Sequence, residues 1–482
     1  MNITTVLLSL VLLLNIVLAM IVIFQERRDI GATWAWLLVL FFIPILGFVM
    51  YLLFGRNLSR NHLFQWDGLK DLGMDETLEN QLTKLDSNDF EFRNASLLNH
   101  KDLIYLHVMN NAAIFTEDNS VELFTDGHEK FDALFKDIEA AKEYIHVQYY
   151  IIKKDKLGTK LVDLLTKKAK EGVKVRVLYD ELGSRGLTKR FFKELREADG
   201  EVEAFFPSKL RFINLRLNYR NHRKLVIIDG KIGYVGGFNV GDEYLGLNSK
   251  FGYWRDTHLR IQGTAVYMLH TRFILDWNQA SHRHAISYAP TLFPENTSQG
   301  NTGIQIVTSG PDSEFEQIKN GYIKMILSAK KSIFIQTPYF IPDASLLDAL
   351  RIACLSGVEV NIMIPNKPDH VFVYWATLSY IGELLKVGAA VYSYSNGFIH
   401  AKTIIVDEEV ASVGTANIDV RSFKLNFEVN AFLYDEHLAK RLTETFKEDI
   451  KVSSLLTVEQ YEQRSKWIRC KESVSRLLSP IL

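Results

Sequence analysis

One pattern of residues occurs twice in the chain, with the same residue types at the same spacing. Each copy is an H-x-K-x4-D motif followed by Gly and Asn. The first copy consists of His222, Lys224, Asp229 and Asn239, and the second of His400, Lys402, Asp407 and Asn417. The His and Asn of the two copies are both 178 residues apart. A single copy would be weak evidence, but two copies in register indicate that a whole domain has been duplicated.

Other segments repeat at a similar distance. Residues 141–148 resemble residues 329–336, and each segment is typical of a helix end or turn that leads into a buried strand. Helical patterns alternate with short β-branched runs, which predicts βα units and a largely parallel sheet in an α/β fold. A period near 180 is too long for a solenoid. We therefore expect two halves, residues 119–290 and 301–482, the second including a C-terminal tail. The linker-like composition of residues 290–310 marks the break.

The front of the chain is nearly free of charge. Residues 1–55 contain four charged side chains, all between Glu26 and Asp29. On either side lie apolar runs, residues 3–24 and 33–54, each long enough at about 1.5 Å per residue to cross a bilayer as a helix. The pattern predicts a transmembrane hairpin within residues 1–56 and a juxtamembrane linker over residues 57–118. A cleaved signal peptide is the alternative, but no basic segment precedes the first run and a second run follows it.

The remaining composition limits the environment and the partners. The chain has 56 Lys and Arg against 57 Asp and Glu, which argues against binding of a polyanion by overall charge. Basic residues occur both in the loop of the hairpin and after it, so they do not fix its orientation. The two cysteines, Cys354 and Cys470, suit a reducing compartment. We expect a multi-pass protein of the cell membrane whose body faces the cytoplasm.

The residue types of the two motifs suit chemistry on a phosphodiester. Two histidines can act as nucleophile and proton donor if one is neutral and the other protonated. Alternation along a strand would place the His and Lys of each motif on one face, where Lys neutralises a phosphoryl oxygen. Asn239 and Asn417 can donate hydrogen bonds to the same phosphate. We expect no metal and no cofactor, because Lys is a poor ligand and no His/Asp/Cys cluster with ligand spacing accompanies the motifs.

The acidic residues near the motifs allow more than one interpretation. Asp229 and Asp407 either support the catalytic architecture or cap the turns that follow their strands. Each histidine also needs a carboxylate to fix its tautomer. Glu428 is the candidate for the second half, behind His400, and Asp256 for the first half. A surface salt bridge is the alternative for both carboxylates.

The paired motifs resemble those of the phospholipase D superfamily, in which two HKD motifs meet at a pseudo-twofold axis and form one active site. Residues 27–57 resemble the double-span leader of bacterial cardiolipin synthases. Three further segments are also similar to that family, namely residues 241–246, 254–258 and 476–480. The resemblance covers nearly the whole chain. It implies two pseudo-symmetric phospholipase D-like βα sandwich halves behind the hairpin.

The resemblance also implies an activity. Two phosphatidylglycerol molecules would give cardiolipin and glycerol through a phosphatidyl-histidine. The motif residues would be catalytic, with His222 as the nucleophile and His400 as the group that protonates the departing glycerol. A hydrolase that uses water as the acceptor is the first alternative. A non-catalytic membrane scaffold is the second, and two complete motifs argue against it.

A basic segment precedes the first motif histidine. Residues 209–224 hold six Lys and Arg, no acids, and interleaved apolar side chains. Such a segment can lie against an anionic leaflet and admit an anionic lipid, or it can be a solvated loop. Nucleic acid is a weaker candidate partner, because the overall charge is neutral and the front of the chain predicts a membrane anchor.

Overall fold

The computed structural model describes residues 3–24, 30–54, 63–64, 73–207, 218–281 and 283–480. Residues 209–217 of the predicted basic segment and the charged residues 26–29 lie outside these ranges.

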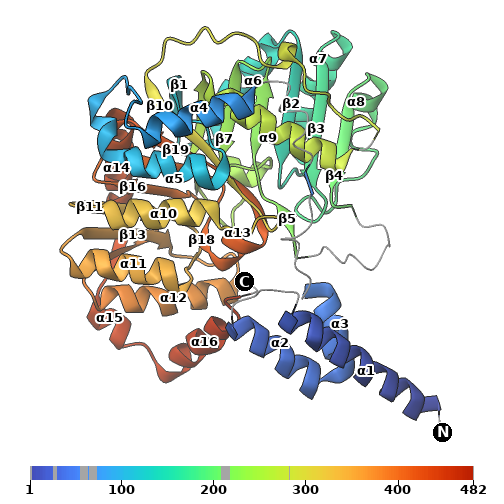
Figure 1. The fold of residues 1–482 in the computed structure, drawn as a ribbon, viewed down its shortest axis with the longest axis vertical. Coiled ribbons are helices and arrows are strands. Elements are labelled where there is room, and N and C mark those ends of the chain that lie inside the picture. The colour runs from blue at the N-terminus through green and yellow to red at the C-terminus, as the bar shows by residue number, and fades with distance from the viewer. Residues whose placement is uncertain are drawn as a thin grey trace.

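A single sixteen-stranded sheet runs through both halves of the chain (Figure 1). In the first half the strand order is β1 (Thr116–Phe124), β9 (His258–Gln262), β7 (Ile232–Gly236), β6 (Leu225–Ile228), β2 (Tyr144–Tyr149), β3 (Lys174–Asp180) and β4 (Glu201–Phe205). In the second half it is β10 (Thr302–Ser309), β19 (Asn426–Tyr434), β17 (Val410–Gly414), β16 (Thr403–Val406), β11 (Ser332–Gln336), β13 (Glu359–Pro365), β14 (Ala390–Tyr394) and β20 (Ser453–Leu456). Apart from β20 the two orders correspond strand for strand, and β1 pairs with β10 where the halves meet. The predicted duplication within an α/β fold is confirmed.

The prediction of a largely parallel sheet is wrong. Within the large sheet, parallel pairing is confined to β2–β3–β4, to β11–β13–β14 and to the sixteenth strand, β5 (Arg220–Asn221), which joins β19 off the main order. The strand between the Lys and the Asp of each motif turns back in a tight hairpin, β6 to β7 and β16 to β17, and hairpin neighbours are antiparallel. The βα pattern of the sequence therefore describes only one side of each half.

Helices cover both faces of the sheet. The helices of the body are α6 (Gly127–Ala140), α7 (Lys156–Lys170), α8 (Lys193–Glu197), α9 (Ala265–Ala280), α10 (Gln317–Ser328), α11 (Ala344–Leu355), α12 (Val371–Leu385), α13 (Val420–Lys424), α14 (Glu436–Lys451), α15 (Val458–Glu462) and α16 (Lys466–Leu477). In β6, Leu225 and Ile227 pack in the core with α9, whereas Val226 and Ile228 pack with α6 and α7. Burial on both faces explains why the motif strands are continuously apolar.

Two predicted linkers are structured instead. Residues 57–118 include α4 (Met74–Asp86) and α5 (Lys101–Asn111), whose apolar side chains join the core of the second half beside α10. The second part of the predicted break, Thr302–Ser309, is strand β10, and nearly all of its residues are buried. Its alternating isoleucines outweigh the linker composition around it.

The front of the chain is helical, but the second predicted span is not one helix. Helix α1 covers Ile3–Phe24, and α2 (Ile30–Phe42) and α3 (Pro44–Phe54) are separated at Ile43, directly before a proline. The three helices pack together: the Asn15 side chain donates to the Leu40 carbonyl at 3.1 Å, and the Trp36 and Tyr51 rings meet edge to face. Over the described residues, no helix combines the length and the apolar character needed to cross a membrane. The two predicted spans are not confirmed.

Candidate active site

Two short strand pairs bridge the halves of the molecule and carry the motif histidines. Strand β5 (Arg220–Asn221) pairs in parallel with β19, and β8 (Trp254–Arg255) pairs in parallel with β15 (Phe398–Ile399). In these registers Asn221 lies opposite Phe427, and Ile399 opposite Arg255. One residue further along, His222 after β5 lies opposite Glu428 of β19. In the same way, His400 after β15 lies opposite Asp256 after β8. The bridging backbone therefore brings residues of both halves into one site.

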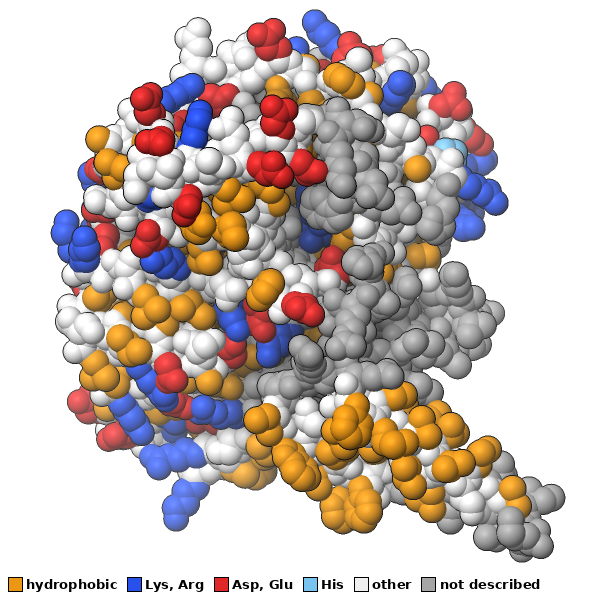
Figure 2. Space-filling view, viewed as in Figure 1, with side chains coloured by type: hydrophobic (Ala, Val, Ile, Leu, Met, Phe, Trp, Pro, Cys, Tyr) orange, Lys and Arg blue, Asp and Glu red, His pale blue; other side chains and the backbone are white. Residues whose placement is uncertain are grey.

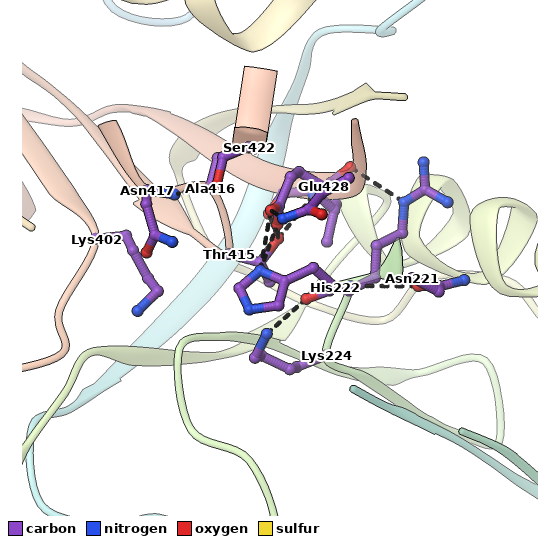
Figure 3. A network of polar contacts seen from close by, with 12 residues as sticks. Asn221, His222, Lys224, Lys402, Thr415, Ala416, Asn417, Ser422 and Glu428 are labelled. Carbon is purple, nitrogen blue, oxygen red and sulfur yellow. Dashed lines mark hydrogen bonds and ion pairs between the residues drawn. The ribbon is translucent and has the colours of Figure 1, made fainter. Parts of the chain in front are cut away.

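Each histidine is paired with a carboxylate of the opposite half. Nδ1 of His222 lies 2.9 Å from both carboxylate oxygens of Glu428, as Figure 3 shows. Nδ1 of His400 lies 2.6 Å from Oδ2 of Asp256. The two carboxylates are the predicted ones, but their assignment is exchanged: Glu428 serves His222 and Asp256 serves His400. The prediction that each histidine pairs with a carboxylate of its own half is wrong, because the strands that align these residues pair with strands of the other half.

The carboxylates are themselves held in place. Glu428 accepts hydrogen bonds from the Thr415 hydroxyl at 2.6 Å and from the Asn426 side chain at 3.1 Å. Asp256 accepts from the backbone N–H of Thr257 at 2.8 Å. Gly237 of the first motif has a steric role here, because a Cβ at this position would overlap the Asp256 carboxylate. Only glycine allows the backbone to approach Asp256 so closely.

The two lysines are buried beside their histidines. Lys224 donates to the His222 carbonyl at 2.6 Å, and Lys402 makes the equivalent contact with the His400 carbonyl. In Figure 3, Lys402 lies across the site from His222 and Lys224. Burial lowers the pKa of Lys224 to about 7 and that of Lys402 to about 8. The His and Lys of each motif lie in extended segments that precede β6 and β16, rather than within these strands as the sequence predicted.

The charge states of the site follow from burial and pairing. Burial lowers the pKa of His222 to about 4, although Glu428 opposes this shift, and burial and Lys402 lower the pKa of His400. For Glu428, burial alone would raise the pKa, but His222 and Lys224 lower it overall. An ionised carboxylate only accepts hydrogen bonds, so each Nδ1 that faces one is the donor and the Nε2 keeps its lone pair. At His400 the Nζ of Lys402 also lies 2.9 Å from Nδ1, but the carboxylate of Asp256 is nearer, at 2.6 Å. Two lysines balance two carboxylates, and an anionic phosphodiester would favour protonation of one histidine.

The two motif asparagines differ in their contacts. Asn239 accepts from the backbone N–H of Ile151 at 3.1 Å and donates to the Tyr244 hydroxyl at 3.3 Å, so both ends of its amide are in use. Asn417 lies near Lys402 in Figure 3, and its buried Oδ1 has no hydrogen-bond partner among the described residues. The unpartnered atom of Asn417 is an acceptor, which cannot donate to a phosphate oxygen, and its side chain already forms a hydrogen bond with Asp419.

The aspartates that end the motifs do not reach the histidines. Both have a positive φ, 52° at Asp229 and 55° at Asp407, in the turns after β6 and β16. The Asp229 carboxylate accepts from the backbone N–H groups of Lys142, Glu143 and Tyr144, and the Asp407 carboxylate from those of Lys330, Lys331 and Ser332. Each aspartate thus fastens its turn to the start of the neighbouring strand, β2 or β11.

Two buried ion pairs beside the site were not predicted. Arg223, next to His222, contacts Asp276 at 2.7 Å, and Arg255, next to Asp256, contacts Asp449 at 2.9 Å. A glutamine completes each pair: Gln148 donates to Asp276 at 2.6 Å and Gln336 to Asp449 at 2.8 Å. The sequence held a signal for these ion pairs, since both glutamines end the repeated segments 141–148 and 329–336. A buried polar residue at a repeated position indicates that both copies have an equivalent hydrogen-bond partner.

No metal site accompanies this arrangement in the parts of the chain that the structure describes, where no group of three or more His, Cys, Asp and Glu side chains is placed to hold an ion.

Known proteins resemble this chain over its whole length. The domain family described as "Cardiolipin synthase, PLD-like domain" matches residues 134–262 and 322–450, and "Phospholipase_D-nuclease N-terminal" matches residues 13–56. The major cardiolipin synthase ClsA of Bacillus subtilis is 72% identical over 482 residues, with all of both chains covered. The cardiolipin synthases of Oceanobacillus iheyensis and Listeria monocytogenes are 61% and 58% identical, also with all of both chains covered.

Among solved structures, a phosphatidylserine synthase from Haemophilus influenzae Rd KW20 aligns with a TM-score of 0.60 at 15% identity. The alignment covers 81% of this chain and 100% of that protein. At this identity the likeness concerns the fold alone.

Proposed function

Because the chain belongs to the cardiolipin synthases with two PLD-like domains, we propose that it transfers a phosphatidyl group between two phosphatidylglycerol molecules at the site between His222 and His400. The observation that carries this proposal is the crossed pairing of the two histidines with Glu428 and Asp256. It gives each half one imidazole whose Nε2 is free for chemistry and whose Nδ1 is fixed.

In the first step, Nε2 of His222 attacks the phosphorus of one phosphatidylglycerol. A P–N bond forms and the bond between phosphorus and the glycerol oxygen breaks. His400 gives a proton from Nε2 to that oxygen, so glycerol leaves as a neutral alcohol. The low pKa of His222 keeps it neutral and nucleophilic. Asp256 stabilises the proton on His400 while the anionic substrate is bound.

The second step reverses the roles around the same phosphorus. His400, now neutral, takes the proton of a headgroup hydroxyl on a second phosphatidylglycerol. The freed oxygen attacks phosphorus, the P–N bond breaks, and cardiolipin forms while His222 is regenerated. Lys224 and Lys402 stabilise the charge that develops on the phosphoryl oxygens in both steps. One phosphodiester replaces another, so no nucleotide is required.

The test uses purified protein in vesicles of phosphatidylglycerol. We expect equal amounts of glycerol and cardiolipin from the wild type and neither product from His222→Ala or His400→Ala. Phosphatidic acid in place of cardiolipin would identify the hydrolase alternative. With labelled lipid, the phosphatidyl adduct on the protein should persist longer in His400→Ala, because its release is slowed. No adduct should form in His222→Ala. An adduct in His222→Ala that is absent in His400→Ala would reverse the assignment of the nucleophile.

We further infer that the N-terminal helices hold the enzyme against a lipid bilayer, with the body on the cytoplasmic side. Their surface is apolar, as the orange side chains over this end of the molecule show in Figure 2. The exposed large side chains include Leu10, Leu13, Ile16, Phe24, Trp34, Phe41 and Phe42. Apolar surface of this extent is stable in contact with lipid rather than water. Labelling of the exposed Cys470 by an impermeant reagent in intact cells would contradict the cytoplasmic placement.

A further inference from the structure

Helix α16 exposes an apolar stripe to solvent. Trp467 is 68% exposed and Leu477 is 81% exposed. Cys470 and Val474 are also exposed and lie between them at helical spacing, so the four residues form one face. A helix on the surface of a soluble body usually has the opposite arrangement, with its apolar face towards the core.

The face of α16 that packs on the body is polar. Glu472 is buried there and pairs with Arg464 at 2.7 Å, and Ser475 is buried beside it. Arg476 forms an ion pair with Glu383 of α12. Polar contacts towards the protein and apolar side chains away from it indicate that the outer face has a partner of its own.

Basic side chains flank the apolar stripe. Among the described residues, Lys466, Arg469 and Lys471 form no ion pair with a carboxylate. The ammonium of Lys471 lies over two indoles, 5.5 Å from the ring centre of Trp467 and 5.2 Å from that of Trp375 in α12. Tryptophan beside lysine and arginine is typical of helices that lie at the headgroup level of an anionic leaflet.

The stripe continues along α12 towards the active site. Val371 and Phe372, in the first turn of α12, are exposed and lie one turn from Trp375. Asp369, two residues before this helix, contacts the Tyr339 hydroxyl. Tyr339 directly precedes β12 (Phe340–Ile341), which pairs with β18 (Ile418–Asp419), and β18 begins next to Asn417 of the second motif. Apolar surface therefore extends from α16 to the edge of the site.

We propose that α16 and the first turn of α12 form a second membrane-docking surface that lies flat on an anionic leaflet beside the active site. For this inference, "docking face" means Trp467, Cys470, Val474 and Leu477 with Val371 and Phe372. It rests on the proposed function, since the substrates must reach the histidines from a bilayer. The apolar side chains enter the headgroup boundary, and the flanking lysines and arginine contact lipid phosphates.

Lipid-borne quenching of a fluorophore on Cys470 tests contact directly. The other cysteine is removed by Cys354→Ser, and the full chain is reconstituted in vesicles of phosphatidylglycerol that contain quencher-labelled lipid. The control carries Lys440→Cys, on the exposed side of α14, in place of Cys470. We expect quenching at position 470 and not at position 440, and weaker quenching at position 470 in phosphatidylcholine vesicles. Equal signals at both positions, or crosslinking of Cys470 to a second copy without quenching, would overturn the proposal.

Kinetics with two forms of the substrate test the consequence. We expect Trp467→Asp with Leu477→Asp to raise the apparent KM for phosphatidylglycerol in vesicles about tenfold, because two apolar contacts with lipid are lost. Activity on dispersed short-chain phosphatidylglycerol should stay unchanged. The control Leu98→Asp alters an exposed leucine outside the docking face, in the short helix Ala95–His100.

The two substrate forms also separate the possible failures. Inactivity of the wild type on both forms contradicts the proposed function. If the wild type is active but the double variant has the same KM in vesicles as the control Leu98→Asp, the docking face alone is contradicted.

Discussion

At the scale of single residues, the crossed carboxylates make a specific prediction. Glu428→Gln replaces an acceptor of the Nδ1 hydrogen of His222 with an amide that can also donate, which favours the wrong tautomer. We expect kcat to fall about 10²- to 10⁴-fold, and equally for Asp256→Asn. Glycerol release measures the effect, and the exposed Glu436→Gln is the matched control. If kcat is retained in both site variants, the pairs hold structure without orienting the histidines.

The lysines predict the pH dependence. Lys224, whose pKa is about 7, and Lys402, whose pKa is about 8, are charged below these values and lose their charge as the pH rises through them. We expect kcat/KM for short-chain phosphatidylglycerol to fall above this range, because the phosphodiester loses its counter-charges. It should also fall near pH 4, where His222 takes up a proton. Lys224→Arg should move the alkaline limb to higher pH, since guanidinium stays charged; an unmoved limb in this variant would exclude Lys224 as its origin.

At the scale of elements, the contacts of the aspartates that end the motifs predict a structural role in the turns rather than a role in the chemistry. Asp229→Ala removes the acceptor of three backbone N–H groups at the start of β2. We expect the free energy of unfolding to fall by about 1–3 kcal/mol, while kcat of the folded protein stays near that of wild type. Thermal unfolding and glycerol release on the same sample measure both. Asp229→Asn, which tolerates the positive φ and keeps one acceptor, should be milder. A loss of kcat without a loss of stability would return Asp229 to the active site.

The same scale shows what the sequence could and could not predict. The motifs His222–Lys224 and His400–Lys402 and the duplication were evident, because they are local patterns that repeat in register. The partners of the histidines were not, because Glu428 is 206 residues from His222 and only the bridging strands β5 and β8 align such distant positions. The antiparallel hairpins and helices α4 and α5 were missed for a related reason. Strand direction and docking of a polar-looking helix depend on the rest of the core rather than on local composition.

At the scale of the whole molecule, the site exists only where both halves meet. The sheet is continuous through β1 and β10, α4 and α5 of the first part of the chain complete the core of the second half, and each histidine uses the carboxylate of the other half. A break in the segment between Pro290–Leu292 and β10 crosses no helix or strand. Fragments 1–297 and 298–482 should therefore be inactive separately and regain glycerol release when co-expressed.

Pairing of intact chains tests whether one chain supplies the whole site. His222→Ala and His400→Ala proteins each retain one motif and both carboxylates. Because β5 and β8 bind strands of the same chain, we expect a mixture of the two variants, co-expressed or refolded together, to release no more glycerol than either variant by itself. The split fragments provide the positive control, since their rescue shows that halves can assemble in this assay. Recovery of about a quarter of wild-type activity from the mixed variants would instead mean that the halves exchange between two chains, as in a domain-swapped dimer.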